Sequence, residues 1–181
     1  MDGNQLRTLQ APLKARYRED PTSAVVTLTA SGEVGQENVA CSVQTGRALV
    51  EAGLHAATGG DGLQACSGDM LLEALVACAG VTLKAVATSL GIQIRTGTIR
   101  AEGDLDFRGT LGVAKDAPVG FKAIRLTFEL DTDASKDQLE KLLSLTERYC
   151  VVYQTLRTPP PIGVSIDAGR LTARDDASAT R

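Results

Sequence analysis

Two of the four cysteines, Cys78 and Cys150, each lie in a stretch with the composition of a long helix. A thiolate is a nucleophile, and it can form a disulfide with a second thiol within reach. Two helices bring their thiols within disulfide distance only when they pack closely, with Cα atoms about 4.4–6.8 Å apart. The residues alone leave a simpler interpretation open, in which both cysteines are small core side chains.

A thiol inside an apolar helix needs a cation nearby, because burial raises its pKa and suppresses its reactivity. The first candidate is Arg47, in the glycine-rich approach to the segment that carries Cys78. Arg18 and Arg16, in the N-terminal segment or from a partner chain, come next. Taken singly, each is more simply a solvated surface arginine. The one histidine, His55, could also polarise a thiol, although a lone loop histidine more commonly lies at the surface.

The segment 67–91 is the element that must position the first of these cysteines. Ala, Leu and Met dominate it, and no proline interrupts it, so it is predicted to be a helix. We expect Ser67 to cap its start, Asp69 to face the positive end of its dipole and Gly91 to end it. Its middle is apolar on nearly every side apart from Glu73, which predicts a buried central helix rather than a membrane span.

The remaining segments alternate between strand and helix patterns. Strands are predicted at 24–34, 39–44, 92–101, 121–130 and 162–166, and a second long helix at 134–156, capped by Asp133 or Ser135. A glycine-rich loop is predicted at 45–66. Strands grouped around one helix indicate an α+β fold in which curved antiparallel sheets wrap a long buried central helix.

A chain of 181 residues fits one domain, which we expect to span 1–181. Within it, residues 1–22 are expected to form an N-terminal docking segment, which is amphipathic over 5–20 and broken at Pro12. Residues 171–181 are expected to form a flexible tail.

The composition argues against several classes of partner. Aromatic residues make up 3% of the chain and the net charge is −3, without a basic cluster, so nucleic acid is not an expected partner. The first residues lack the pattern of a signal peptide, and no membrane attachment is expected. Four cysteines in such a chain indicate a reducing cytoplasm, in which thiols are kept for chemistry.

Several segments resemble the OsmC/Ohr superfamily of osmotically inducible and organic hydroperoxide resistance proteins. They are the first-cysteine segment Asp69–Cys78 with Leu90–Ile92 after it, Gly103–Asp106, Gly120–Phe121, and the second-cysteine segment Glu147–Cys150. The chain departs from the family at two places. Val151 follows the second cysteine where proline is common, and Ser67–Asp69 stands where the family often has an Asn-Pro-Glu type of entry.

The resemblance implies a thiol-dependent peroxidase acting on organic hydroperoxides. Cys78 would be the peroxidatic nucleophile and Cys150 the resolving thiol. An external dithiol, such as a lipoyl group, would reduce the disulfide, with no metal, flavin or haem. The family also implies an intertwined homodimer with the site at the subunit interface, and an activating arginine held by an acidic residue, here Asp69 or Glu73.

Three other functions remain open at this point. A non-catalytic OsmC-like dimer could bind a small apolar ligand in the same pocket. A zinc site would draw on all four cysteines and His55, but no pair has the spacing of structural zinc ligands. The cysteines are Cys41, Cys66, Cys78 and Cys150. An acyl-transfer enzyme would need His55 as its base.

Overall fold

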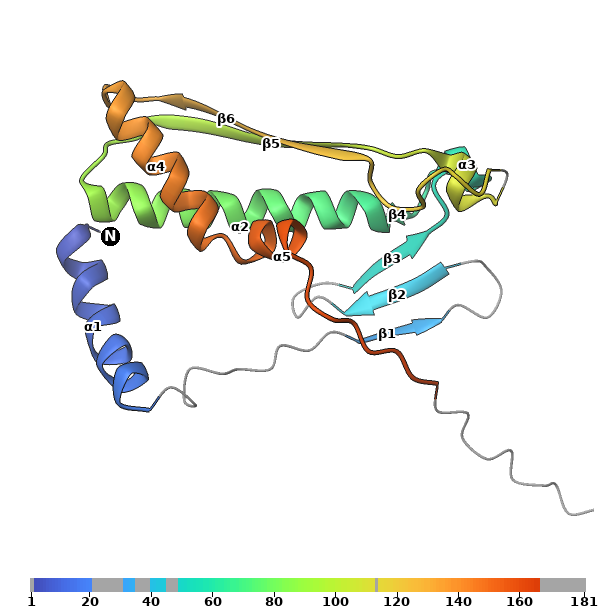
Figure 1. Ribbon diagram of the computed structural model, residues 1–181, viewed down its shortest axis with the longest axis horizontal. Coiled ribbons are helices and arrows are strands. Elements are labelled where there is room, and N and C mark those ends of the chain that lie inside the picture. Colours follow the sequence, from blue (N-terminus) through green and yellow to red (C-terminus); the bar gives the residue numbers. More distant parts are fainter. Residues whose placement is uncertain (1, 21–30, 35–39, 45–48, 113, 167–181) are drawn as a thin grey trace, which may run out of the picture.

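The computed structural model describes the backbone of residues 2–20, 31–34, 40–44, 49–112 and 114–166. Helices and strands are mixed in the predicted α+β manner, with two small sheets and one long central helix (Figure 1). The elements in order are α1 (Gly3–Glu19), β1 (Ser31–Val34), β2 (Ala40–Gln44), β3 (Leu49–Gly53), η2 (Ala56–Thr58), β4 (Ala65–Cys66), α2 (Ser67–Leu90), β5 (Thr96–Asp104), α3 (Phe107–Thr110), β6 (Ala123–Asp131), α4 (Lys136–Tyr149) and α5 (Val151–Arg157).

Helix α2 is the axis of the molecule, as predicted. Asp69 lies in its first turn, and Gly91 ends it with a φ of 71°, a left-handed conformation that glycine adopts without steric cost. The expected cap was wrong by one residue. Cys66 occupies the N-cap position without a side-chain cap bond, and Ser67 is the first helical residue.

One face of α2 is buried and the other is not. The buried residues recur at helical spacing and are Leu75, Ala79, Leu83, Val86 and Ala87. The opposite face carries Glu73, Ala77 and Val81, and Val81 is 74% exposed. The expectation of burial on nearly every side was therefore wrong for this single chain. By length and composition α2 would also qualify to cross a membrane, a test that core helices pass as well.

The sheet of β5 and β6 lies along one side of α2 (Figure 1). The two strands are antiparallel, with Thr96 opposite Asp131 and Asp104 opposite Ala123. Alternate residues of β6 face inward and are half-buried, namely Ile124, Leu126, Phe128 and Leu130. The residues between them are exposed, so the sheet has one apolar and one polar face, as the alternation over 121–130 predicts.

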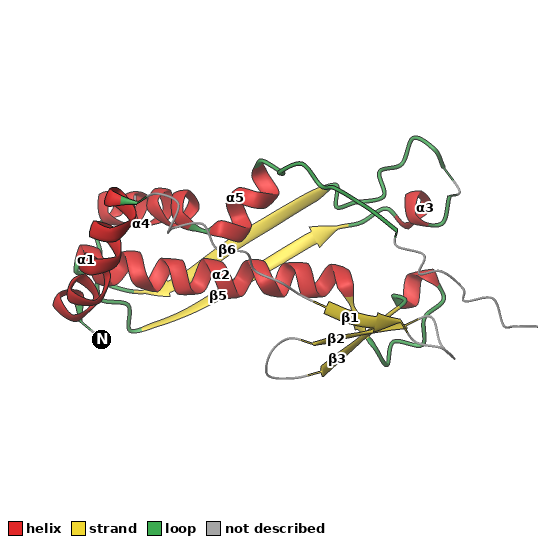
Figure 2. Ribbon diagram, turned by 90° about the horizontal axis from the view of Figure 1, so that it is seen from below, coloured by secondary structure: helices red, strands yellow, loops and turns green. Residues whose placement is uncertain are grey.

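The second sheet has the order β1-β2-β3-β4 and lies near the N-terminal end of α2, as the view from below shows (Figure 2). Strands β1 to β3 are antiparallel, and the short β4 runs parallel to β3 and leads directly into α2. The predicted loop 45–66 was therefore partly wrong, because β3, η2 and β4 lie within it. Residues 24–30 of the first predicted strand lie outside the described residues.

The second long helix is divided at Cys150. Helix α4 ends at Tyr149, Cys150 has extended backbone angles (φ −74°, ψ 109°), and α5 begins at Val151, so the single helix predicted at 134–156 was wrong. Ser135 caps α4 in a capping box with Gln138, as the sequence allowed.

The two ends of the described chain also differ from expectation. Helix α1 continues through Pro12, where a break was predicted. Proline removes one backbone hydrogen bond from a helix interior, which α1 tolerates here. Residues 162–166 form no strand and follow the proline run in an irregular, exposed conformation. The predicted flexible tail, 171–181, lies outside the described residues.

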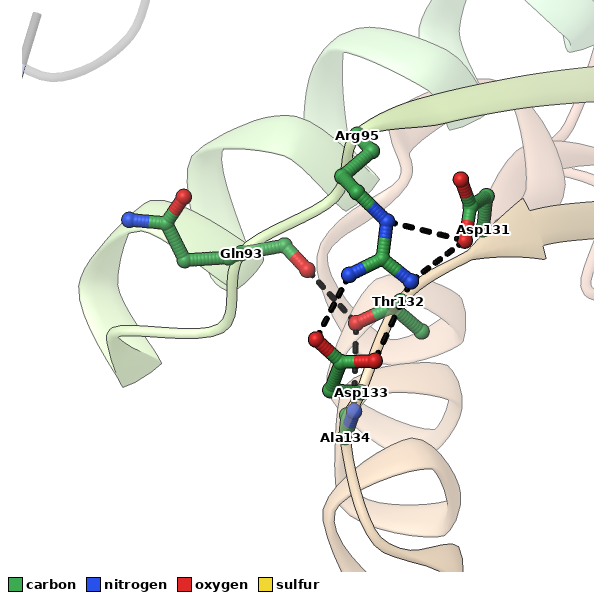
Figure 3. A network of polar contacts seen from close by, with 6 residues as sticks. All are labelled: Gln93, Arg95, Asp131, Thr132, Asp133 and Ala134. Atoms are coloured by element: carbon green, nitrogen blue, oxygen red, sulfur yellow. Dashed lines mark hydrogen bonds and ion pairs between the residues drawn. The ribbon is translucent and has the colours of Figure 1, made fainter.

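A polar network ties the end of α2 to the start of α4 (Figure 3). The Arg95 guanidinium donates to the carboxylate of Asp131 at 2.5 Å and to that of Asp133 at 2.6 Å. The Thr132 hydroxyl donates to the Gln93 carbonyl. All these side chains except Thr132 are exposed, so the network fixes the path of the loop and contributes little to stability.

Candidate active site

The fold brings Cys78 and Cys150 together. Cys78 lies in the middle of α2, and Cys150 lies where α4 passes into α5, the two helices that cross α2 in Figure 1. Cys150 is 0% exposed, and its backbone N–H donates to the Thr146 carbonyl at 2.9 Å. Cys78 is partly exposed. The two thiols lie close enough for each to shift the pKa of the other, and both are free.

The surroundings of Cys78 favour its thiolate. Burial by itself raises the pKa of this thiol. Hydrogen bonds from the backbone N–H groups of Val152 and Val151 act in the opposite direction, as do those from the Cys150 thiol and the Thr82 hydroxyl. The net result is a pKa of Cys78 below that of an ordinary cysteine, because hydrogen bonds to the charged form outweigh desolvation.

Cys150 is shifted in the opposite direction. Burial raises the pKa of this thiol, and the hydrogen bond and negative charge of Cys78 raise it further. The backbone N–H groups of Tyr153 and Val152 offset only part of this effect. The two pKa values therefore move apart, and Cys78 is the more readily ionised thiol of the pair.

The expected activating arginines are not among the described side chains. Arg47 lies outside the described residues, and so do the side chains of Arg16 and Arg18 on α1. Asp69 and Glu73, the expected acidic partners, are exposed on α2. Within the described part of the chain, no charged side chain contributes to the lowered pKa of Cys78.

Sequence reasoning missed three groups around the sulfur, namely the N–H groups of Val151 and Val152 and the Thr82 hydroxyl. The chain itself carries no signal for the first two, because Val151 stands where the family commonly has proline, a residue favoured at the first position of a helix. Thr82 follows Cys78 by four residues, which is one helical turn.

The other candidate residues lie apart from this pair. Cys66 precedes α2 and is twelve residues from Cys78, about 18 Å along the helix. The His55 ring stacks on Phe107 with centroids 4.9 Å apart, and its Nδ1 accepts from the Ala57 N–H. The side chain of Cys41 is outside the described side chains, and the described residues include no cluster that could hold a metal ion.

Two hollows lie against the helices that carry the pair. One, of about 510 Å³, lies between β6, α4 and α5; Leu75 and Tyr153 are among its lining residues. The other, of about 560 Å³, lies between α1, α2 and α4 and is lined mainly by apolar side chains, with Thr82 among them.

Comparison with known proteins places this arrangement in a family. The family model described as OsmC-like protein matches residues 59–165, more than half of the chain and including both cysteines. A search of curated proteins gave no match.

Solved structures share the fold at low sequence identity. An OsmC-like protein from Mycoplasma pneumoniae is 15% identical, with a TM-score of 0.61 over 74% of this chain and 89% of its own. An organic hydroperoxide resistance protein OsmC from Legionella pneumophila is 17% identical, with a TM-score of 0.58 over 74% and 91%. Organic hydroperoxide resistance protein OhrB from Bacillus subtilis is 20% identical, with a TM-score of 0.50 over 74% and 93%. The chain therefore belongs to the OsmC-like proteins of the OsmC/Ohr superfamily.

Proposed function

We propose that the protein is a thiol-dependent peroxidase that reduces organic hydroperoxides, with Cys78 as the peroxidatic and Cys150 as the resolving cysteine. The observation that carries this proposal is that Cys78 on α2 and Cys150 at the junction of α4 and α5 come together, with their pKa values shifted in opposite directions. A reactive cysteine needs a stabilised thiolate, and a resolving cysteine needs to lie beside it. Relatives named organic hydroperoxide resistance proteins support the choice of substrate class.

The reaction balances over two steps. The Cys78 thiolate attacks the terminal oxygen of the hydroperoxide, the O–O bond breaks, and the alkoxide leaves and takes a proton from water, giving sulfenic acid and an alcohol. Cys150 then attacks the sulfenic sulfur, and its own proton leaves with the hydroxide as water. A disulfide between Cys78 and Cys150 is the product.

The disulfide is returned to two thiols by an external reductant. We propose a dithiol, of the lipoyl type, which supplies two electrons and two protons and becomes a cyclic disulfide. No metal, flavin or haem takes part in this scheme. A cytoplasmic location fits it, because the reducing environment there keeps structural thiols free.

We also propose a homodimer. The uncovered face of α2, with Val81 74% exposed, is apolar enough to need a cover, and the neighbouring Tyr149 is 59% exposed. A second copy would cover this face and could bring an arginine to the site. Arg47 and Arg18 remain the proposed residues, with Asp69 or Glu73 as acidic partners.

An alternative is a non-catalytic dimer that binds a small apolar ligand. The hollow of about 510 Å³ beside β6 favours it, because side chains such as Leu126, Phe128 and Leu156 line a space large enough for such a ligand. In that case the two cysteines would be core residues retained from the family that do not react with hydroperoxides.

Steady-state turnover distinguishes the two functions. Purified protein is mixed with cumene hydroperoxide and dihydrolipoamide, and peroxide consumption is followed. The proposal predicts turnover that is lost in Cys78→Ser and retained in Cys66→Ser, the matched control. A wild-type protein that consumes no more peroxide than Cys78→Ser would favour the ligand-binding alternative.

A further inference from the structure

Residues 162–166 form an extended segment whose apolar side chains contact little of their own chain. Three apolar residues alternate with small ones in it, and Ile162, Val164 and Ile166 are 82%, 89% and 92% exposed. Alternation with a period of two places their side chains on one face of an extended backbone. The segment makes no backbone hydrogen bond with the described residues. It therefore has the pattern of a strand without having a partner strand in the described part of its chain.

Strand β6 has an edge at which such a segment could pair. Among the described residues, β5 and β6 form a sheet of two strands, so the outer edge of β6 carries backbone N–H and C=O groups that no strand pairs. Strand β5 is the one that packs on α2, where a Cβ atom added at Gly80 would lie 3.0 Å from the Ile99 side chain. A third strand, added at the β6 edge, would stabilise this small sheet.

The apolar face of β6 is also incompletely covered. The hollow of about 510 Å³ lies between β6, α4 and α5, and another of about 400 Å³ lies between β6, α2 and α4. Leu126, Phe128 and Leu143 line both hollows, so the two form one apolar groove along β6. A strand added beside β6 would direct every second side chain toward this groove, which is the spacing of the apolar residues in 162–166.

The proline run Pro159–Pro161 directs the segment away from the β6 of its own chain. Consecutive prolines favour an extended, semi-rigid backbone, because each ring fixes φ. Figure 1 shows the chain leaving α5 on the side of α2 opposite the sheet of β5 and β6. A segment held out in this way can reach the sheet edge of a neighbouring molecule more readily than that of its own chain.

We propose that residues 162–166 of one copy add as a strand to the outer edge of β6 in a second copy, with their apolar side chains over the groove. This inference rests on the homodimer of the proposed function and gives it a contact surface besides the one at Val81. Strand addition supplies backbone hydrogen bonds, and the buried side chains supply apolar contact. The exposed Ser165 would then join the outer, polar face of the sheet, beside residues such as Thr127.

The first test measures the dissociation constant of the dimer by analytical ultracentrifugation. Val164→Asp should raise this constant at least about tenfold, because a carboxylate would be placed in an apolar groove. Ser165→Asp is the matched control and should stay close to wild type, since its side chain points to the opposite, solvent-facing side of the strand. A wild-type dimer that Val164→Asp leaves unchanged would overturn the inference and leave the homodimer intact, whereas a wild-type protein of one chain would overturn the homodimer itself.

The second test does not depend on how well the charged variant folds. Val164→p-benzoylphenylalanine, an apolar photo-crosslinker, is prepared with ¹⁴N and with ¹⁵N, and the two samples are unfolded together, refolded and illuminated. We expect mass spectrometry to find residue 164 linked to β6, with the two peptides carrying different labels in half of the products because copies pair at random. Links confined to one label would show pairing within a chain and overturn the inference, as would links to another segment or none. Neither test uses peroxide turnover, so both are independent of the peroxidase proposal.

Discussion

The Cys78 sulfur is held by peptide groups as well as by side chains. Val151 and Val152 are the first two residues of α5, and their backbone N–H groups lower the pKa of Cys78, which lies on α2. Peptide donors are fixed by the fold and cannot be neutralised, so they stabilise a thiolate at any pH at which the protein is folded. Val151 can do this only because it is not proline, which has no N–H.

Val151→Pro tests the contribution of the Val151 N–H group to the pKa of Cys78. The backbone suits proline, because Val151 is the first residue of α5 and Cys150 before it is extended. Loss of the N–H should raise the pKa of Cys78 and slow its alkylation by iodoacetamide at neutral pH by about tenfold. As pH falls through the lowered pKa of wild-type Cys78, alkylation should decline, and in the variant this decline should begin at higher pH.

Val151→Ala is the matched control, because it keeps the N–H and shortens an exposed side chain. It should retain the wild-type pH dependence of alkylation. Equal pH dependence in Val151→Pro and Val151→Ala would show that this peptide group does not stabilise the thiolate.

Cys150→Ser separates the two chemical steps. Cys78 should still react with one equivalent of hydroperoxide, since most of its hydrogen bonds remain. Without the resolving thiol, the protein should accumulate Cys78 sulfenic acid, trapped with dimedone, and lose turnover with dihydrolipoamide. Unchanged steady-state turnover in Cys150→Ser would contradict the resolving role.

At the scale of elements, α4 places Cys150 by packing on α2. Leu142 of α4 is 1% exposed and belongs to the same core cluster as Leu83 and Ala87 of α2. This contact fixes the distance between the helices, and so the distance between the thiols. The capping box of Ser135 and Gln138 fixes where α4 begins.

Leu142→Ala should lower the free energy of unfolding by about 2–5 kcal/mol, because it opens a cavity at a fully buried position. Leu143→Ala, one residue along and 43% exposed, should cost much less. Urea unfolding of both variants, followed by circular dichroism, measures the difference. A similar loss of stability in the two would contradict the packing described for α4.

The elements differ in how well the sequence predicts them, and the reasons are physical. Strand β6 and helix α2 are predicted well, because period-two alternation and an unbroken run of helix formers are local signals. The break at Cys150 could not be predicted from the residues around it, since Tyr-Cys-Val-Val carries no glycine or proline. The pairing of β3 with β2 and β4 depends on how these neighbouring segments fold against one another, which the propensity of each segment alone does not encode.

The candidate site shows the same contrast. Cys78 and Cys150 were predicted from the sequence and its family resemblance, and the structure brings them together. The donors around the sulfur were not predicted, because two of them are backbone groups whose direction depends on where α5 begins.

At the scale of the whole molecule, the uncovered face of α2 predicts self-association. Val81 is an apolar side chain that is 74% exposed on this helix. Exposure of apolar surface to water is unfavourable, so a single chain would be less stable than one whose face is covered. Light scattering after size exclusion should therefore give twice the mass of one chain. Val81→Glu should shift the protein toward a single chain, whereas Ser144→Glu, on an exposed position of α4, should not. A wild-type mass of one chain would contradict the proposed dimer.

The proposed peroxidase is tested most directly by the fate of the Cys78 and Cys150 sulfurs after one equivalent of organic hydroperoxide. Peptide mapping by mass spectrometry, with free thiols blocked by N-ethylmaleimide at acid pH, identifies which cysteines become linked. We predict a disulfide between Cys78 and Cys150, with Cys66 still free. Cys78 and Cys150 both recovered as blocked thiols, with the peroxide unconsumed, would contradict it.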